Sequence, residues 1–227
     1  MPEFDLAAQP LRELNAALHA LPADTNETHW EVLNPGGKHA IAAGLDAPVT
    51  VELRGNAGYY CAGMNQAATV IIHGNAGVGV AENMMSGTVL VHGDASQSAG
   101  ATAHGGLLVI DGNASGRCGI SLKGADIVVK GSVGPMSAFM AQAGNLVVLG
   151  DAGEALGDSI YEARLFVRGT VKSLGADCEE KQMGAADRAI LENLLAAAGV
   201  AAEADAFRLY GSARRLYHFH VDNADAY

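Results

Sequence analysis

The residues of this sequence best suited to chemistry are His73, His92 and Asp111, which follow one another at intervals of 19 residues. If each interval is one turn of a stacked structure, strands about 4.8 Å apart would bring the three side chains within reach of a single metal ion. The next three intervals place at the same position Lys130, Leu149 and Arg168. That mixture is typical of a solvated edge, so we expect no metal site. If a metal binds after all, His73, His92 and Asp111 are the candidate ligands.

Histidines and cysteines elsewhere give weaker indications. His218 and His220 would share one face of an extended segment, where an interface strand is favoured over a metal-binding pair. Cys61 and Cys118 hold one repeat position three intervals apart, so stacking would separate them by about 14 Å, too far for a disulfide. That position is otherwise mostly apolar, which predicts buried, unreactive sulfur. Together with Cys178, these residues predict reduced thiols and a cytoplasmic protein.

Motifs for cofactor binding or catalysis do not emerge. Residues 74–79 (GNAGVG) look like a dinucleotide fingerprint, but another strand follows them where such a site needs a long helix. The sequence shows no phosphate-binding loop, Ser/His/Asp order, paired carboxylates or CxxC pair, so we expect no catalytic site and no cofactor in this chain. Five methionines in the glycine-rich halves of the repeat are interpreted as core-filling residues: Met64, Met84, Met85, Met136 and Met140.

The elements that must position all these residues come from a 19-residue repeat. One glycine marks it, at Gly55, Gly74, Gly93, Gly112, Gly131, Gly150 and Gly169. The four residues before each glycine alternate, with Val, Leu or Ile at the first and third positions, which is typical of a short strand with one buried face. Asn, Asp, Ser or Thr follows each glycine, and the Gly-Asn and Gly-Asp pairs predict turns with left-handed backbone angles.

Small residues occupy two further positions of the repeat, seven and thirteen residues after the glycine, and predict corners where backbones come close. A unit of this length is too short for a strand–helix–strand crossover. The repeat therefore predicts an all-β solenoid, a parallel β-helix of about seven coils with each coil stacked on the last.

The ends of the chain differ from the repeat. We expect a helical cap over residues 1–29, the β-helix domain over residues 30–175, and a C-terminal helix with a tail over residues 176–227. Leucines spaced along residues 10–21 predict an amphipathic helix that covers the open end of the rod. The turn-rich residues 34–39 form either a binding loop or the entry into the first coil, and the entry is favoured.

Beyond the repeat, residues 179–200 predict a helix with Ile190, Leu191, Leu194 and Leu195 on its apolar side. The basic and aromatic tail from Ala206 to Tyr227 either contacts a partner or folds back along the rod. The sequence alone favours neither alternative.

The charge of the chain restricts its partners. With 14 Lys and Arg against 25 Asp and Glu, the net charge is −11. Such an acidic chain is poorly suited to nucleic acid or to an anionic membrane surface. No apolar run approaches the roughly 18 residues of a membrane span, and the first 20 residues lack the apolar core of a secretory signal. We expect a protein that binds neither nucleic acid nor membrane.

The repeat also resembles a known family. A Val-x-Val-x-Gly-Asn/Asp-Ala-Gly unit recurs, with its second glycine at Gly58, Gly77, Gly134 and Gly153. It resembles the GXGXG domain, which is the right-handed β-helix at the C-terminus of the glutamate synthase large subunit and also forms the C subunit of formylmethanofuran dehydrogenase. The resemblance spans about residues 30–175 and implies the same right-handed fold. The second glycine is replaced at Ser96, Ser115 and Lys172.

As a free-standing chain, the sequence is most similar to the B subunits of N-methylglutamate synthases (methylamine–glutamate N-methyltransferases). The resemblance implies a non-catalytic structural subunit of a hetero-oligomer that makes N-methylglutamate and ammonia from glutamate and methylamine. Its partners would be an amidotransferase-like subunit and an FMN-binding glutamate-synthase-like subunit that also holds iron–sulfur clusters. The alternative is a C subunit of a formylmethanofuran dehydrogenase or formyltransferase/hydrolase complex. A free-standing β-helix lyase or acyltransferase is a third class, but the small, apolar repeat positions do not form its charged groove.

Overall fold

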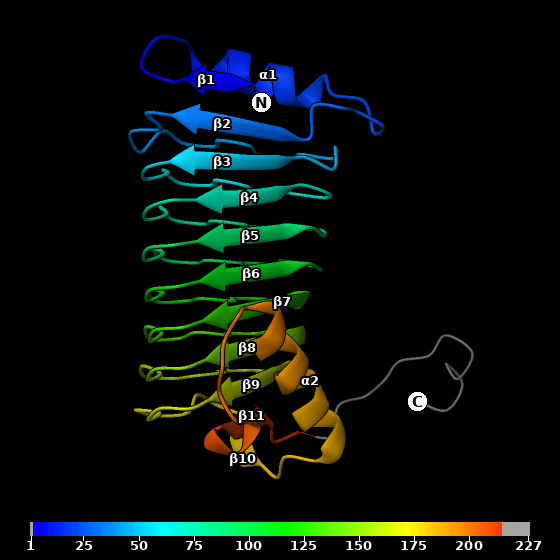
Figure 1. Ribbon diagram of the computed structural model, residues 1–227. Coiled ribbons are helices and arrows are strands. Elements are labelled where there is room, and N and C mark those ends of the chain that lie inside the picture. Colours follow the sequence, from blue (N-terminus) through cyan, green and yellow to red (C-terminus); the bar gives the residue numbers. More distant parts are fainter. Residues whose placement is uncertain (1, 215–227) are drawn as a thin grey trace, which may run out of the picture.

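The computed structural model describes residues 2–214 and shows a right-handed parallel β-helix of about seven coils, which confirms the predicted fold class (Figure 1). Strands β1 to β9 pair in chain order as one parallel sheet, and β11 and then β10 extend it in antiparallel fashion. The strands are β1 (Glu3–Asp5), β2 (His29–Leu33), β3 (Thr50–Arg54), β4 (Thr69–Ile72), β5 (Thr88–Val91), β6 (Leu107–Ile110), β7 (Lys123–Val129), β8 (Ala143–Val148), β9 (Arg164–Val167), β10 (Cys178–Lys181) and β11 (Arg208–Ser212). The helices are α1 (Leu11–His19), α2 (Ala185–Ala197) and the short 3₁₀ helix η1 (Ala204–Ala206).

The 19-residue spacing is the register of the sheet. Thr50 pairs with Thr69 and Thr69 with Thr88, so each strand lies directly over the next coil's equivalent residues. The first coil is longer, because His29 pairs with Thr50. The alternating Val, Leu and Ile side chains, such as Val51, point into the coil, where they are fully buried. Their burial forms a continuous apolar core along the rod and supplies most of the stabilising free energy.

The half of each coil opposite the sheet has an unusual backbone. Every second residue there takes a positive φ, as at Tyr60, Ala62 and Met64, and the same three positions recur in later coils. The N–H groups of successive positive-φ residues donate to opposite neighbouring coils. The Tyr60 N–H donates to Val78 O of the next coil, whereas the Ala62 N–H donates to Ile41 O of the coil before. Neighbouring coils are thus hydrogen-bonded without an extended strand, and the first small-residue position of the repeat is the buried, central one of the three.

The residue after each repeat glycine plays a different part from the one predicted. Asn75, Asp94 and Asn113 do not have positive φ, so the left-handed turn expected there is wrong. Their side chains instead accept a hydrogen bond from the backbone of the next coil: the Asn113 N–H donates to Asp94 Oδ1 at 2.7 Å, and the Ser132 N–H donates to Asn113 Oδ1 at 2.9 Å. Asn, Asp and Ser suit this position because each carries a short side-chain acceptor.

The hydrogen bonds from backbone N–H groups to the side chains of the preceding coil form a ladder along the rod, and replacing Asn113 by Ala removes one of them. The Ser132 N–H loses its acceptor, and we expect a loss of about 1 kcal/mol in the free energy of unfolding. Thermal or urea unfolding measures it. Ser132→Ala is a second test of the ladder, because the Asp151 N–H donates to Ser132 Oγ at 2.9 Å. Unchanged stability in both variants would show that water replaces the ladder at no cost.

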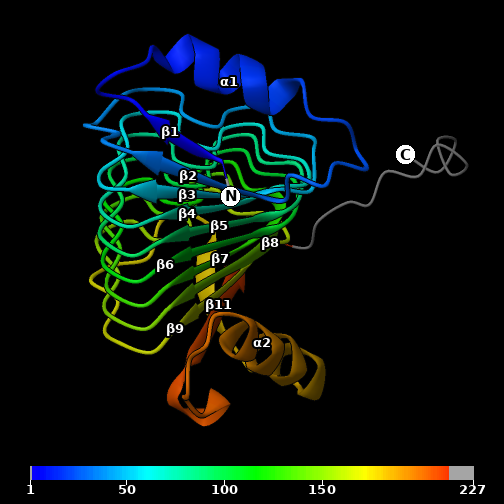
Figure 2. The same cartoon turned by 45° about the horizontal axis from the view of Figure 1, so that its top comes forward.

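The N-terminal segment covers the first coil (Figure 2). Leu14 and Leu18 of α1 are fully buried in the main core, and Leu11 and Leu21 pack against it. Asn15 hydrogen-bonds the backbone of the first coil, in the place that a preceding coil takes elsewhere in the rod. Its Nδ2 donates to Ala40 O at 2.9 Å, and its Oδ1 accepts the Ala42 N–H at 3.0 Å. The segment also contains β1, which the sequence did not predict and which pairs with β2.

The C-terminal segment packs on the outer face of the sheet over the later coils (Figure 1). Leu191, Leu194 and Leu195 of α2 form a second apolar cluster with Val128 and Phe166 from the sheet. The helix is shorter than predicted at its N-terminus, because Cys178–Lys181 forms β10 and Gly184 is the N-cap of α2. Within residues 2–214, no helix combines the length and the hydropathy needed to cross a membrane.

The structure decides between the two alternatives for the first part of the tail. The structure places Phe207, Leu209 and Tyr210 in the interior, and β11 pairs with both β9 and β10. Residues 206–214 therefore fold back onto the rod and are part of the fold, which is the second of the two alternatives considered for the tail. Residues 215–227, including the His218 and His220 candidates, lie outside the described residues.

Candidate functional site

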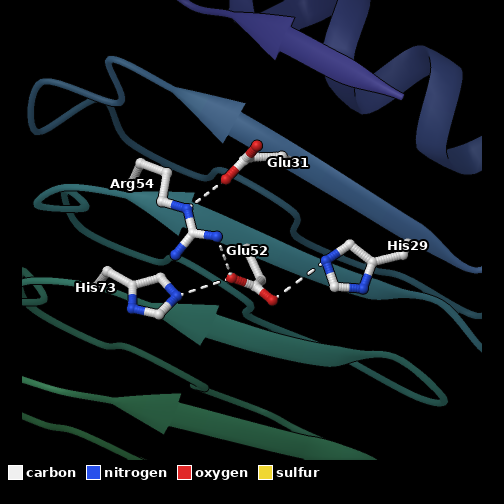
Figure 3. Close-up of polar contacts among 5 residues, drawn as sticks. All are labelled: His29, Glu31, Glu52, Arg54 and His73. Carbon is white, nitrogen blue, oxygen red and sulfur yellow. Dashed lines mark hydrogen bonds and ion pairs between the residues drawn. The ribbon is translucent and has the colours of Figure 1, made fainter. Parts of the chain in front are cut away.

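A group of charged and ionisable side chains lies on the outer face of strands β2 to β4 (Figure 3). Glu52 of β3 is its centre. Its Oε1 lies 3.1 Å from His29 Nε2, and its Oε2 lies 2.9 Å from His73 Nε2 and 2.8 Å from an Arg54 terminal nitrogen. Arg54 also donates through Nε to Glu31 of β2. The parallel register builds this cluster, because it stacks outward-facing residues of β2, β3 and β4 on one another.

Glu52 is held in its charged form. Its side chain is only 16% exposed. The hydrogen bond from His73 is the largest influence and, with the charges of Arg54, His29 and His73, it lowers the pKa of Glu52 below its ordinary value despite the burial. The cluster thus pairs two carboxylates with one guanidinium and two imidazoles. Its internal pairing makes it an ion-pair network of the scaffold, with its carboxylates already satisfied.

The metal candidates continue this network along the rod. The His73 and His92 rings lie 5.1 Å apart between centroids, close to the spacing predicted from the repeat. Each imidazole nevertheless has its own carboxylate: His73 bonds Glu52, and His92 Nδ1 lies 2.6 Å from Asp111 Oδ2. Within residues 2–214, no group of three or more His, Cys, Asp or Glu side chains is arranged to hold a metal ion.

Asp111 ends this series in another ion pair. Its Oδ1 lies 2.7 Å from Lys130 Nζ. Burial opposes the charge of Asp111, but the hydrogen bonds from Lys130 and His92 outweigh it and lower its pKa. In this stack Asp111 lies between His92 and Lys130 and pairs with both, as expected for the solvated edge that the sequence indicated.

Replacing Glu52 by Gln tests the network through its pH dependence. Because the pKa of Glu52 is lower in the folded chain than in the unfolded one, its charge stabilises the fold above about pH 4.5 and ceases to do so as the pH falls through the folded pKa. We expect Glu52→Gln to cost about 1 kcal/mol at pH 7 and progressively less below pH 4.5. Melting temperatures across this range measure it, with Glu192→Gln on the exposed side of α2 as control. A difference that stays constant with pH would contradict the role of the charge.

The three cysteines are free thiols. Cys61 and Cys118 are completely buried, and burial raises the pKa of each to about 12. Cys178 is half-buried, and burial raises its pKa to about 11. Thiols with such pKa values stay protonated at neutral pH, so the expectation of unreactive sulfur agrees with the structure.

The methionine prediction is largely wrong. Met84 is fully buried, but Met64, Met85 and Met140 are each at least 40% exposed. The reason is the positive-φ segment, in which Met64 and Met140 occupy the last of the three alternating positions and point outward. In the described chain the exposed large apolar side chains all lie between strands, at Tyr59, Met64, Val78, Met85, Met140, Tyr161 and Leu174.

The turn-rich residues 34–39 belong to the first coil. The Gly37 N–H donates to Asn56 O, and Lys38 O accepts the Gly58 N–H, so the segment is stacked on the second coil. His39 Nδ1 accepts the Tyr59 N–H, with the two rings 4.5 Å apart. Of the two alternatives for this segment, the structure shows the coil entry.

Sequence reasoning missed Glu52, Arg54, His29 and Glu31. Arg54 precedes its repeat glycine as His73 and His92 do, so extending their series by one coil toward the N-terminus would have found it. His29 could not be found this way, since the first coil is two residues longer than the repeat.

These features define a parallel β-helix protein with a side-chain-filled interior and an internally paired polar network on its outer face. No family model matches the chain. Protein GlxC from Rhizobium meliloti (strain 1021) is 62% identical to it over 228 residues, and the match covers 100% of each chain. The chain therefore belongs to the same family as that protein.

Proposed function

We propose that this chain is the non-catalytic structural subunit of a split glutamate-synthase-like enzyme, and more specifically of an N-methylglutamate synthase. The observation that carries the proposal is the stack of 19-residue coils with its column of glycines, which is the pattern of the GXGXG domain. In this role the chain bridges an amidotransferase-like subunit and an FMN-binding synthase-like subunit in the cytoplasm.

The physical character of the rod supports a bridging role. Its core is continuous from the first coil to the last, and its coils are locked by backbone and side-chain ladders, so it can hold two partners at a fixed separation. The exposed methionines and tyrosines between the strands are residue types that protein interfaces favour. We assign partner contacts to that side of the coils.

Cofactors are assigned to the partners. An iron–sulfur cluster needs several cysteines that converge, whereas Cys61 and Cys118 are buried in separate coils and Cys178 lies in β10. The three cysteines do not fit such a cluster, so we place the FMN and the iron–sulfur clusters in the synthase-like subunit.

An affinity-tagged copy purified from the native host tests the proposal, with an untagged strain as control. We expect a large complex with flavin absorbance, in which mass spectrometry identifies an amidotransferase-like and a synthase-like chain. Companions with molybdopterin- or amidohydrolase-like sequences would instead indicate the formylmethanofuran dehydrogenase alternative. A colourless eluate holding this chain alone would overturn both.

The reaction itself needs a second measurement. The purified complex should form N-methylglutamate from glutamate and methylamine, and the complex from a strain without this chain should dissociate or lose the activity. A complex that fully retains activity without this chain would contradict a structural role in catalysis.

A further inference from the structure

Three successive coils in the middle of the rod differ in charge from the rest of this acidic chain. Their segments from the second to the thirteenth residue after the repeat glycine are residues 95–106, 114–125 and 133–144. These segments contain no Asp or Glu, although the chain has 25 of them. The corresponding segments on either side are acidic, with Glu82 before them and Glu154 and Asp158 after them. Through these segments the middle coils therefore expose no carboxylate.

Two cations in these segments have no carboxylate to pair with. Arg117 and Lys123 are exposed, and neither side chain makes an ion pair or a hydrogen bond among residues 2–214. The outer face of the sheet differs, because Lys130 pairs there with Asp111. An unpaired guanidinium keeps all five of its N–H donors, and an unpaired ammonium keeps three. Both groups are therefore available to carboxylates from outside the chain.

Apolar side chains lie beside these cations without belonging to a core. Ile120 and Phe139 hold the same position in adjacent coils, which backbone hydrogen bonds join. Met136 holds the position of Arg117 one coil further on. Ile120, Met136 and Phe139 are partly exposed, and none of them is a member of either apolar cluster. With Met140, which is 40% exposed, they form apolar area that the described chain leaves uncovered.

We propose that these residues form a docking surface, the middle patch, for a partner protein whose own surface is apolar at its centre and carries carboxylates at its edge. The middle patch consists of two cations and four apolar residues: Arg117, Ile120, Lys123, Met136, Phe139 and Met140. Aromatic residues, Met and Arg are the types that protein interfaces favour. The inference rests on the proposed function, because the occupant is one of the two partner subunits, and it adds the part of the rod and the chemistry of the contact.

Charge favours this occupant over the others. A second copy docked patch to patch would place Arg117 and Lys123 against the same two cations, and like charges across an interface are unfavourable. Nucleic acid and anionic membranes are bound through many cations, whereas the middle patch offers two within a chain of net charge −11. A protein partner needs only one or two carboxylates opposite these cations, together with apolar area that covers Ile120 and Phe139.

Carbodiimide cross-linking of the complex purified from the native host tests the contact, because this reagent joins an ammonium group to a carboxylate only where the two touch. We expect mass spectrometry of the linked peptides to show Lys123 joined to an Asp or Glu of a companion chain. Lys123→Arg keeps the positive charge but removes the reactive amine, so it should abolish this cross-link and retain the companion within twofold. A complex in which Lys123 is linked to no companion chain, or to a second copy of this chain, would overturn the proposal.

Variants measure how much the middle patch contributes. Arg117→Glu combined with Lys123→Glu should reduce the recovered companion at least tenfold, and Phe139→Gln should reduce it at least threefold. Arg208→Glu is the matched control, because Arg208 is an exposed cation of β11 outside the patch, and it should leave the recovery within twofold. Circular dichroism and the melting temperature show whether each variant folds.

The outcomes separate this inference from the proposed function. If the wild-type chain has companions and the folded double variant retains them in full, the inference fails while the proposed function stands. If the wild-type chain purifies alone, both fail.

Discussion

A chain truncated after Asp205 is expected to lose its C-terminal structure, including the docking of α2 on the sheet. The truncation removes β11, whose Tyr210 pairs with Leu165 of β9 on one side and with Glu180 of β10 on the other. Without it, β10 loses its only neighbouring strand in the described sheet order. The second apolar cluster also loses Phe207 and Leu209.

The size of the effect follows from the buried side chains. Phe207, Leu209 and Tyr210 are each less than 7% exposed, and burying side chains of this kind contributes roughly 5–9 kcal/mol in total. That is comparable with the whole stability of a domain. Hydrogen exchange should therefore show rapid exchange over residues 178–200, while the early coils keep their protection because coils interact mainly with their neighbours.

A chain truncated after Arg214 is the control, since it retains β11, and its melting temperature should stay within a few degrees of the full-length value. If truncation after Asp205 leaves α2 protected, the antiparallel extension contributes little to the fold. If both truncations destabilise equally, the effect belongs to residues 215–227.

The sequence did not distinguish the two alternatives for this segment, and the reason is physical. Arginines and aromatic residues together suggested a contact surface, because those residue types are enriched at interfaces. In β11 only Arg208 is exposed, and the next three residues, Leu209, Tyr210 and Gly211, are all buried. A strand of five residues without regular alternation of buried and exposed positions carries no pattern that distinguishes it from a basic contact tail.

The fold of the repeat, by contrast, could be predicted from the sequence, because each position of the repeat has the same surroundings in every coil. A one-residue slip would turn every Val and Ile outward, so the alternation before each glycine determines both the strands and their register. The same spacing predicts that His73 and His92 lie close together, and their rings do. It does not predict that Glu52 and Asp111 bond these imidazoles, because partners across coils depend on side-chain direction as well as on spacing.

The backbone conformation between the strands was the other feature that the sequence did not predict. Left-handed φ values are costly for residues with a Cβ, so Tyr60, Ser98 and Met140 gave no sign of them. Hydrogen bonds to both neighbouring coils compensate for the strain. Left-handed angles were expected beside the repeat glycines, where the structure does not place them.

Gly112→Ala is expected to destabilise the rod by about 3 kcal/mol or more, although alanine suits the backbone conformation there. The φ of Gly112 is not positive, so the strained conformation that the sequence suggested for the glycine column is wrong at this position. The restriction is steric. A Cβ would lie 2.3 Å from Asp94 Oδ1 and 2.8 Å from Gly93 O, and these atoms belong to the preceding coil. The coils must separate to admit it, which weakens the hydrogen bond from the Gly112 N–H to Gly93 O.

Gly211→Ala is the matched control for this substitution. It also adds one methyl group at a glycine without positive φ, but its nearest neighbour is 3.7 Å away, and we expect a change within about 0.5 kcal/mol. Denaturant unfolding of the two variants separates a steric effect from an effect on the conformational entropy of the unfolded chain. Conformational entropy alone predicts a small gain in stability for both variants. A fall in stability for Gly112→Ala alone identifies close coil stacking as the constraint that places a glycine every 19 residues. Equal stability of the two variants would mean that the coils yield to a methyl group, and the glycine column would then need another cause.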